Sequence, residues 1–348
     1  MSEYRYSVGA DTTTVVLSRA TVAELLDADA GHAAAALLVA DRNTIELCRD
    51  YAGPRIVLPA GEDAKQWSSI AAIVELALTE GVSRDGRMIG VGGGAVCDVA
   101  AFAASIYMRG ISLTLVPTTL LAMVDAAFGG KTGINFHGYK NMVGTFYPAA
   151  RLLVAPSALH SLPPREFQSG MAEVIKSAML GDAELFDFLE REHAAVVQRR
   201  VDALHTIVQR SLAVKAAVVE RDFTELGIRA WLNLGHTFGH ALESVAGFGR
   251  YTHGEAVAWG MACALDLGVA LGITEPDYAA RARMLIERYG FVLQVEGIEV
   301  DALLQAMQHD KKVRSGTLRF VLQRGLTQTE LAPVAERTVR AVLRARIR

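Results

Sequence analysis

The chain contains 348 residues with a formal net charge of -3, from 35 basic and 38 acidic residues. This length suggests about two domains, and the near-neutral charge excludes the basic footprint of a nucleic-acid-binding protein. The three cysteines, Cys48, Cys97 and Cys263, lie too far apart for a disulfide framework or a CxxC metal motif. The polar first residues lack a signal-peptide pattern, and no apolar run is long enough to span a bilayer, so we expect a cytoplasmic protein without a membrane partner.

Short apolar runs alternate with helical patterns in the first half of the chain. We expect strands at residues 35–40, 55–58, 88–91, 112–116 and 152–155. We expect helices between them at residues 66–79 and 95–108. Strands that alternate with helices imply a mostly parallel sheet that is covered on both faces.

The pattern changes after Pro163-Pro164, where long segments with helical spacing dominate. We expect helices at residues 166–180, 183–192, 201–222, 237–246 and 255–271, one strand at 318–322, and a last helix with a solvated basic face at 337–348. The sequence therefore predicts an α/β, Rossmann-like domain over residues 1–160, followed by an all-α domain over residues 161–348.

A glycine-rich turn, Gly92-Gly93-Gly94, lies between a predicted strand and a predicted helix. Backbone without side chains can approach a pyrophosphate closely, and the helix N-terminus favours an anion. The third glycine of the dinucleotide fingerprint is replaced by Cys97, so a purely structural turn explains the motif about as well. Asp41, at the end of an earlier strand, is a candidate for the ribose or for the cap of the following turn.

A second polar cluster follows the strand at residues 112–116. It contains Thr118-Thr119, Asp125, Gly129-Gly130-Lys131-Thr132-Gly133 and Lys140-Asn141. Free backbone amides, hydroxyl groups and two lysines suit a phosphorylated ligand. The alternative is a glycine-rich connector with solvated lysines.

Histidines gather in the second half of the chain. His236 and His240 share one helix face, His253 begins the next helix, and Glu173 is an acid in an apolar turn. Two imidazoles and a carboxylate are the ligands of a catalytic zinc, but spacing alone leaves open a capping or core role for the histidine pair. Five further polar residues, considered one at a time, are each more typical of a solvated surface position. They are Lys215, Arg229, Asn233, Lys311 and Lys312.

Together these segments resemble the 3-dehydroquinate synthase family of sugar-phosphate cyclases, from about residue 62 to residue 320. The strings that carry the resemblance are Gly92-Gly93-Gly94, Tyr107-Met108-Arg109-Gly110, Val116-Pro117-Thr118-Thr119-Leu120-Leu121, Gly129-Gly130-Lys131-Thr132-Gly133, Lys140-Asn141-Met142, Ala172-Glu173-Val174-Ile175-Lys176, Asn233-Leu234-Gly235-His236-Thr237-Phe238-Gly239-His240, His253-Gly254-Glu255 and Asp310-Lys311-Lys312-Val313.

The resemblance implies an N-terminal NAD-binding domain, a helical metal-binding domain, an active site in the cleft between them, and a homodimer. A divalent metal, zinc or cobalt, would be bound by Glu173, His236 and His253. NAD would contact Asp41, Glu62, Lys65, Gly93, Gly94, Ala95, Val96, Asp98, Thr118, Thr119, Lys131 and Lys140. We assign catalytic roles to Asp125, Lys131, Lys176, Asn233, His240 and Glu243. Substrate contacts would come from Asn141, Lys215, Arg229, Lys311, Lys312 and from Arg109 across the dimer interface.

The implied reaction belongs to the shikimate pathway of aromatic amino acid biosynthesis. It cyclises 3-deoxy-arabino-heptulosonate 7-phosphate to 3-dehydroquinate, with transient oxidation of a hydroxyl by NAD, elimination of phosphate, re-reduction and an aldol closure. NAD is regenerated in each cycle.

Some positions depart from the family pattern and leave the substrate open. The segment Asn135-Phe136-His137-Gly138-Tyr139-Lys140-Asn141 and the pair Gly144-Thr145 resemble valiolone-type cyclases, which act on sedoheptulose 7-phosphate. Lys215, Arg229 and a lysine of the pair at 311–312 match the family's contacts to a substrate carboxylate, which favours the carboxylated substrate. A surface pairing of Lys215 and Arg229 with acids such as Glu220 or Glu225 is the structural alternative. A metal-dependent polyol dehydrogenase and a non-catalytic binding protein are the remaining hypotheses.

Overall fold

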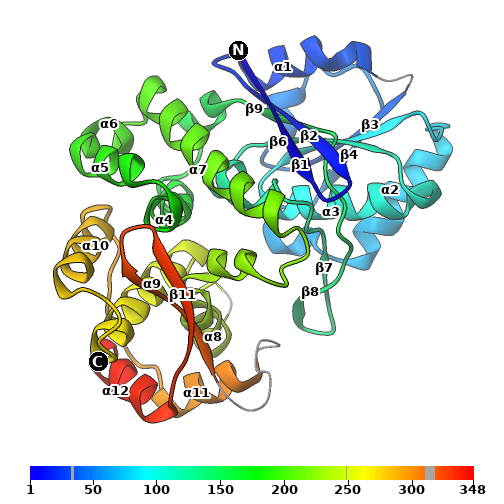
Figure 1. Cartoon of the computed structure of the whole chain (residues 1–348). Coiled ribbons are helices and arrows are strands. Elements are labelled where there is room, and N and C mark those ends of the chain that lie inside the picture. The colour runs from blue at the N-terminus through cyan, green and yellow to red at the C-terminus, as the bar shows by residue number, and fades with distance from the viewer. Residues whose placement is uncertain (33–34, 248, 310–317) are drawn as a thin grey trace. The chain divides into compact units, whose positions relative to one another are not determined.

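The chain folds into two compact units (Figure 1), and the computed structural model describes residues 1–32, 35–247, 249–309 and 318–348. The first unit comprises Met1–Pro163 with Val201–Thr224, and the second comprises Pro164–Arg200 with Glu225–Arg348. The expected ranges of 1–160 and 161–348 therefore differ from these units at helix α7 (Val201–Arg221), which packs against β1 within the first unit. Among the helices that the structure describes, none combines the length and apolar character that crossing a membrane requires.

A seven-stranded sheet with the order β1-β2-β9-β6-β5-β3-β4 forms the core of the first unit. Its strands are β1 (Ser2–Val8), β2 (Asp11–Leu17), β3 (Ala36–Asp41), β4 (Arg55–Leu58), β5 (Arg87–Gly92), β6 (Ser112–Pro117) and β9 (Arg151–Val154). All neighbours pair in parallel except β1 and β2. The expected strands are thus confirmed. The β1–β2 hairpin was missed because its polar, half-exposed edge strand carries no apolar run.

Helices α2 (Trp67–Thr79) and α3 (Gly94–Ile106) pack on each other against the sheet, as predicted. Helix α1 (Val22–Asp29) and the small hairpin of β7 (Ile134–Phe136) and β8 (Tyr139–Val143) were not predicted.

The strand order reverses beside β3, which has β4 on one side and β5 on the other. In open α/β sheets, ligands bind outside the carboxyl ends of the strands at such a switch point. Ala40 of β3 pairs with Val91 of β5, so Asp41 and the glycine turn after β5 lie side by side. The Thr44 hydroxyl joins them, 2.9 Å from both Asp41 Oδ1 and the Val91 carbonyl oxygen.

Helices dominate the second unit. They are α4 (Pro164–Gly181), α5 (Ala183–Arg191), α6 (His193–Val197), α8 (His236–Ala246), α9 (His253–Ala270), α10 (Pro276–Arg288), α11 (Val300–His309) and α12 (Glu336–Arg346). The strand expected at residues 318–322 is confirmed as β10 (Arg319–Gly325), which pairs with β11 (Gln328–Pro333) in an antiparallel hairpin, so the predominantly helical second unit is not all-α. Buried Gln323 anchors the hairpin, because its amide donates to the Met179 carbonyl oxygen at 2.7 Å.

The C-terminal helix α12 is confirmed, but its basic face is not simply solvated. The Arg346 guanidinium lies 2.6 Å from Asp266 of α9, and Arg340 pairs with Asp301 of α11. These ion pairs fasten the last helix to the rest of the second unit.

Helix α9 is the centre of the second unit, and glycines let its neighbours approach it closely. A side chain at Gly254 would place its Cβ 2.0 Å from the Ser169 carbonyl oxygen of α4, and one at Gly260 would place it 2.0 Å from the Gly235 carbonyl oxygen. At Gly239 of α8 the nearest atom, the Ala256 carbonyl oxygen, would lie at 3.0 Å. Only glycine permits these backbones to touch.

We predict that Gly260→Ala lowers the free energy of unfolding by about 1–3 kcal/mol, because the added methyl forces α8 away from α9. Chemical denaturation followed by circular dichroism measures the change. Gly31→Ala is the matched control, since its methyl would meet no atom within 4 Å. Equal stability of the two variants would contradict this account of the helix packing.

Candidate metal and nucleotide site

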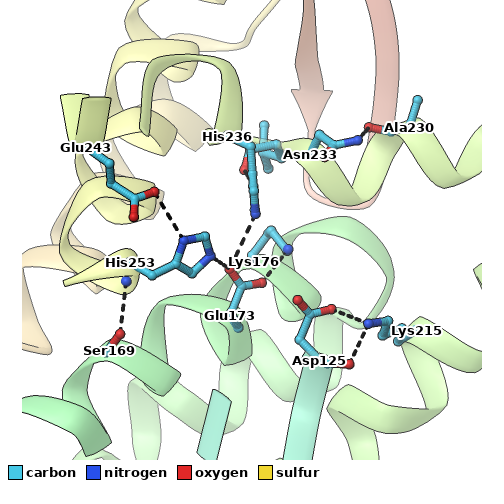
Figure 2. Close-up of polar contacts among 12 residues, drawn as sticks. Asp125, Ser169, Glu173, Lys176, Lys215, Ala230, Asn233, His236, Glu243 and His253 are labelled. Carbon is cyan, nitrogen blue, oxygen red and sulfur yellow. Dashed lines mark hydrogen bonds and ion pairs between the residues drawn. The ribbon is translucent and has the colours of Figure 1, made fainter. Parts of the chain in front are cut away.

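Three side chains from three helices of the second unit converge on one point (Figure 2). Glu173 of α4 is fully buried, and its Oε1 lies 3.7 Å from Nε2 of His236 on α8 and 3.4 Å from Nε2 of His253 on α9. Their candidate ligand atoms all lie within 4.8 Å of one another. The glycine contacts between α4, α8 and α9 produce this convergence.

Both imidazoles have a second partner on the side away from Glu173. His236 Nδ1 lies 3.2 Å from the Leu234 carbonyl oxygen, and His253 Nδ1 lies 3.4 Å from Glu243 Oε2. An acceptor at Nδ1 holds the proton there and leaves the Nε2 lone pair available, which is the usual arrangement around a metal-binding histidine.

The buried carboxylate is balanced by cationic groups. Lys176, one turn after Glu173 on α4, pairs with Glu173 Oε2 and is itself buried. Burial lowers the pKa of His253, but hydrogen bonds and charge interactions with Glu173 and Glu243 outweigh it and raise the pKa to about 9. A metal ion that binds Nε2 must therefore release a proton.

The donor set fits a divalent metal. Two imidazoles and one carboxylate are the protein ligands of a catalytic zinc site, which keeps a further position for water or substrate. A buried carboxylate without a cation would be costly, and here Lys176 and the two rings surround it. His240, expected to be catalytic, is exposed, and its ring centroid lies 6.2 Å from that of His253.

In the first unit, the glycine turn joins β5 directly to α3. Gly93 is the N-cap of α3, and the first residues of the helix, Gly94, Ala95 and Val96, follow at once. A Cβ at Gly92 would lie 2.6 Å from Val96 Cβ, so the turn is too tight for a side chain there. Cys97 stands at the fingerprint's third glycine, whose role is close helix–strand packing. Gly90 supplies that contact, since its Cβ would lie 2.8 Å from Ala100 Cβ.

Asp41 caps the turn that follows β3. Its Oδ1 accepts the backbone amides of Asn43 at 2.9 Å and Thr44 at 3.0 Å. The capping role considered from the sequence is thus present. It also orients the carboxylate beside the glycine turn.

A buried lysine joins residues expected to contact NAD with one expected to contact substrate. Lys65 Nζ lies 2.6 Å from Asp98 Oδ2 of α3 and also donates to Asn141 Oδ1 of β8. Burial raises the pKa of Asp98, and Lys65 acts in the opposite direction. Three expected site residues therefore form one hydrogen-bonded cluster.

Asn135 of β7 completes this cluster and was missed in the sequence. Its amide donates to Glu62 Oε2 at 2.8 Å, its Oδ1 accepts the Asn141 amide at 3.0 Å, and its backbone amide donates to the Lys65 carbonyl oxygen at 2.9 Å. The one available signal was its place in the short segment between Gly133 and Gly138.

Lys131 lies on an extended segment rather than in a free loop. It pairs as an isolated bridge with Phe146, and Thr132 Oγ1 accepts the Thr145 amide at 2.9 Å. The Lys140 side chain is exposed on β8. Thr118 donates its amide to the Gly92 carbonyl oxygen at 2.9 Å, and the Thr119 hydroxyl caps the next turn by accepting the Ala122 amide at 3.2 Å.

Lys215, expected to contact substrate, pairs in the first unit with Asp125, which was assigned a catalytic role. Lys215 Nζ of α7 donates to both the carbonyl oxygen and Oδ1 of Asp125, each at 2.5 Å (Figure 2). Glu220, proposed as an alternative partner of Lys215, instead accepts the Ser7 amide at 2.9 Å.

The remaining candidates are Asn233, Arg229 and Arg109, which the structure describes, and two lysines, which it does not. Asn233 donates to Glu225 Oε1 at 2.6 Å, and the nearby Arg229 is only 2% exposed. Arg109 is exposed on a left-handed backbone with φ 68°. Lys311 and Lys312 lie outside the residues that the structure describes.

The chain thus combines a Rossmann-like unit with a helical unit that carries a Glu-His-His cluster. Solved structures of sugar-phosphate cyclases share this fold. A 2-epi-5-epi-valiolone synthase from Streptomyces hygroscopicus, solved with NAD⁺ and Zn²⁺, matches with a TM-score of 0.86 and 29% identity, covering 99% of this chain and 97% of its own. A 2-deoxy-scyllo-inosose synthase, solved with carbaglucose-6-phosphate, NAD⁺ and Co²⁺, matches with a TM-score of 0.89 over 99% and 100% of the two chains, and its 24% identity shows the fold alone.

The chain belongs to the 3-dehydroquinate synthase family. The N-terminal model of the family matches residues 55–169, and the C-terminal model matches residues 170–313. A 3-dehydroquinate synthase from Acidithiobacillus ferrooxidans is 45% identical over 271 residues, which cover 78% of this chain and 74% of the relative. One from Synechococcus sp. is 45% identical over 278 residues, covering 79% and 75%. The chain is thus an enzyme of the sugar-phosphate cyclase type.

We predict that Asn135→Ala loosens the β7–β8 hairpin, because the Glu62 carboxylate and the Asn141 amide lose a shared partner. Each hydrogen bond contributes about 0.5–1.5 kcal/mol, so amide hydrogen exchange in residues 134–143 should rise about 5- to 100-fold. Asn43→Ala is the control, since only its backbone amide is used in the Asp41 turn. Unchanged exchange in Asn135→Ala would show that the hairpin does not depend on this side chain.

Proposed function

We propose that the chain cyclises 3-deoxy-arabino-heptulosonate 7-phosphate to 3-dehydroquinate with release of phosphate, and that it uses NAD and one divalent metal ion. The observation that carries the proposal is the convergence of Glu173, His236 and His253 in a chain 45% identical to proteins named 3-dehydroquinate synthase. When bound, the metal would polarise oxygens at the substrate carbon that is oxidised, and NAD would accept and return one hydride.

The chain's own residues suit the remaining tasks. Glu173, His236 and His253 would hold the metal, and Lys176 would keep the buried carboxylate neutralised. In the first unit, the amides at the start of α3 would face the pyrophosphate of NAD, while Asp41 would meet its ribose. Lys131 and Arg109 would supply positive charge to the departing phosphate, while Lys140 would contact NAD.

We also propose that the active form is a homodimer and that Arg109 serves the partner's site. Support comes from the family resemblance around residues 107–110 and from the surroundings of Arg109. The neighbouring Met108 and Ile106 side chains are 42% and 39% exposed, and an exposed apolar pair beside a strained backbone suits an interface.

We predict that His253→Ala lowers metal affinity by more than about 100-fold, beyond the 10- to 100-fold typical of losing an outer partner of a metal ligand. Metal analysis of purified protein and competition with a chromogenic chelator measure this. His160→Ala, which changes an exposed histidine of the first unit, should keep a full metal complement. Full metal content and full activity in His253→Ala would exclude the proposed ligand set.

The substrate is tested by assaying phosphate release from 3-deoxy-arabino-heptulosonate 7-phosphate and sedoheptulose 7-phosphate side by side. We expect faster cyclisation of the carboxylated sugar. Faster turnover of sedoheptulose 7-phosphate would favour the valiolone-type alternative, which the sequence around residues 135–141 supports. Accumulation of NADH in proportion to product would instead identify a dehydrogenase.

We predict that Arg229→Ala lowers kcat/KM for the carboxylated sugar about 10- to 150-fold. A charge-assisted contact contributes about 1.5–3 kcal/mol, and about 1.4 kcal/mol corresponds to a tenfold change. The loss should be absent with sedoheptulose 7-phosphate, which has no carboxylate. Arg221→Ala, at the exposed end of α7, is the control for loss of a positive charge. An equal effect on both sugars would remove the assigned role of Arg229.

A further inference from the structure

Glu243 faces the far side of a proposed metal ligand. It lies on α8, seven residues after His236 and three after His240, so all three occupy one helix face. Its Oε2 lies 3.4 Å from Nδ1 of His253, and its side chain is 15% exposed. The opposite nitrogen of the same ring, Nε2, lies 3.4 Å from Glu173. The His253 ring is thus held between two carboxylates (Figure 2).

The two histidines obtain their Nδ1 acceptors in different ways. His236 uses the backbone carbonyl of Leu234, two residues earlier in its own turn. His253 is the first residue of α9, and its Nδ1 lies 3.4 Å from Oε2 of Glu243 on α8. A side chain from another helix therefore takes the place of the backbone acceptor.

The backbone of His253 is fixed by contacts that do not involve its ring. Thr252 and Glu255 form a capping box at the start of α9, and the Gly254 amide donates to Ser169 Oγ at 3.0 Å. These contacts position the Cα atom and leave the orientation and tautomer of the ring undetermined. The positive end of the α9 dipole also disfavours a nearby cation, and a carboxylate beside the ring offsets that effect.

We propose that Glu243 is a positioning residue. Its carboxylate accepts a hydrogen bond from Nδ1–H of His253, and this orients Nε2 of the same ring towards the metal. This inference rests on the proposed function only in taking Glu173, His236 and His253 as the ligands. It replaces the catalytic role expected for Glu243, which acts through His253 rather than on substrate. Helix α8 then supplies one ligand and also the group that orients another.

The experiment titrates metal-free protein with Co²⁺, followed by visible absorption, and with Zn²⁺ against a chromogenic chelator. We expect Glu243→Ala to weaken binding about 10- to 100-fold, the range for loss of an outer partner, and to alter the Co²⁺ spectrum. Glu243→Gln keeps an acceptor oxygen and should lose less than about tenfold. Glu287→Gln, at an exposed position of α10, should bind metal like wild type.

Thermal unfolding separates positioning from general stability. The metal-free forms of Glu243→Ala and wild type should melt alike, while the metal-induced rise in Tm should be smaller in the variant. A lower Tm of the metal-free variant with unchanged metal affinity would assign Glu243 a purely structural role.

Two further results would overturn the inference. One is wild-type Co²⁺ affinity and spectrum in Glu243→Ala. The other is that Glu243→Ala loses a second, more weakly bound metal ion while the first binds as in wild type. That result would place Glu243 in a separate site with His240 and His253, because the ligand atoms of these three residues also lie within 4.8 Å of one another. Failure of wild type itself to bind metal would instead contradict the proposed function.

Discussion

The close approach of three helix backbones is the constraint on which the second unit depends. Gly254 and Gly260 leave no room for side chains between α9 and its neighbours, so α4, α8 and α9 are held at contact distance. Glu173, His236 and His253 each lie on one of these helices and meet because the backbones meet. The same packing brings Glu243 beside His253. A metal site built on rigid helices needs little reorganisation when it is filled.

The first unit assembles its polar groups by another constraint, the parallel sheet. Strands β3 and β5 end at the same edge, where the strand order reverses, so Asp41 and the glycine turn become neighbours despite about fifty intervening residues. The β7–β8 hairpin adds Asn135 and Asn141 to Lys65, which holds Asp98 of α3. A short two-stranded hairpin supplies Asn135 and Asn141, so their order depends on hydrogen bonds rather than on helix packing.

Charged residues of the candidate sites in each of the two units are held in pairs. Lys65 pairs with Asp98, Lys176 with Glu173, and Lys215 with Asp125. A buried charge is costly without a partner, so each lysine is stabilised and oriented before any ligand arrives. An anionic ligand that contacts one of these lysines must compete with the lysine's carboxylate partner. Ligands whose negative charge does not align with the lysine therefore bind less favourably. Pairing of this kind favours specificity over affinity.

Local patterns in the sequence were enough to predict many of the secondary-structure elements and candidate site residues. Periodicity predicted the central strands and long helices, since it depends only on which side of an element is buried, and the glycine turn and the metal-binding residue types were readable from their chemistry. The polar edge strand β1, strand β11 and Asn135 carry weak local signals and were missed, whereas the strand predicted at residues 318–322 corresponds to β10. Helix spacing placed His236 and His240 on one face but could not choose between His240 and His253 as partner of Glu173. Tertiary packing made that choice, because the distance between residues on different helices depends on how closely their backbones approach.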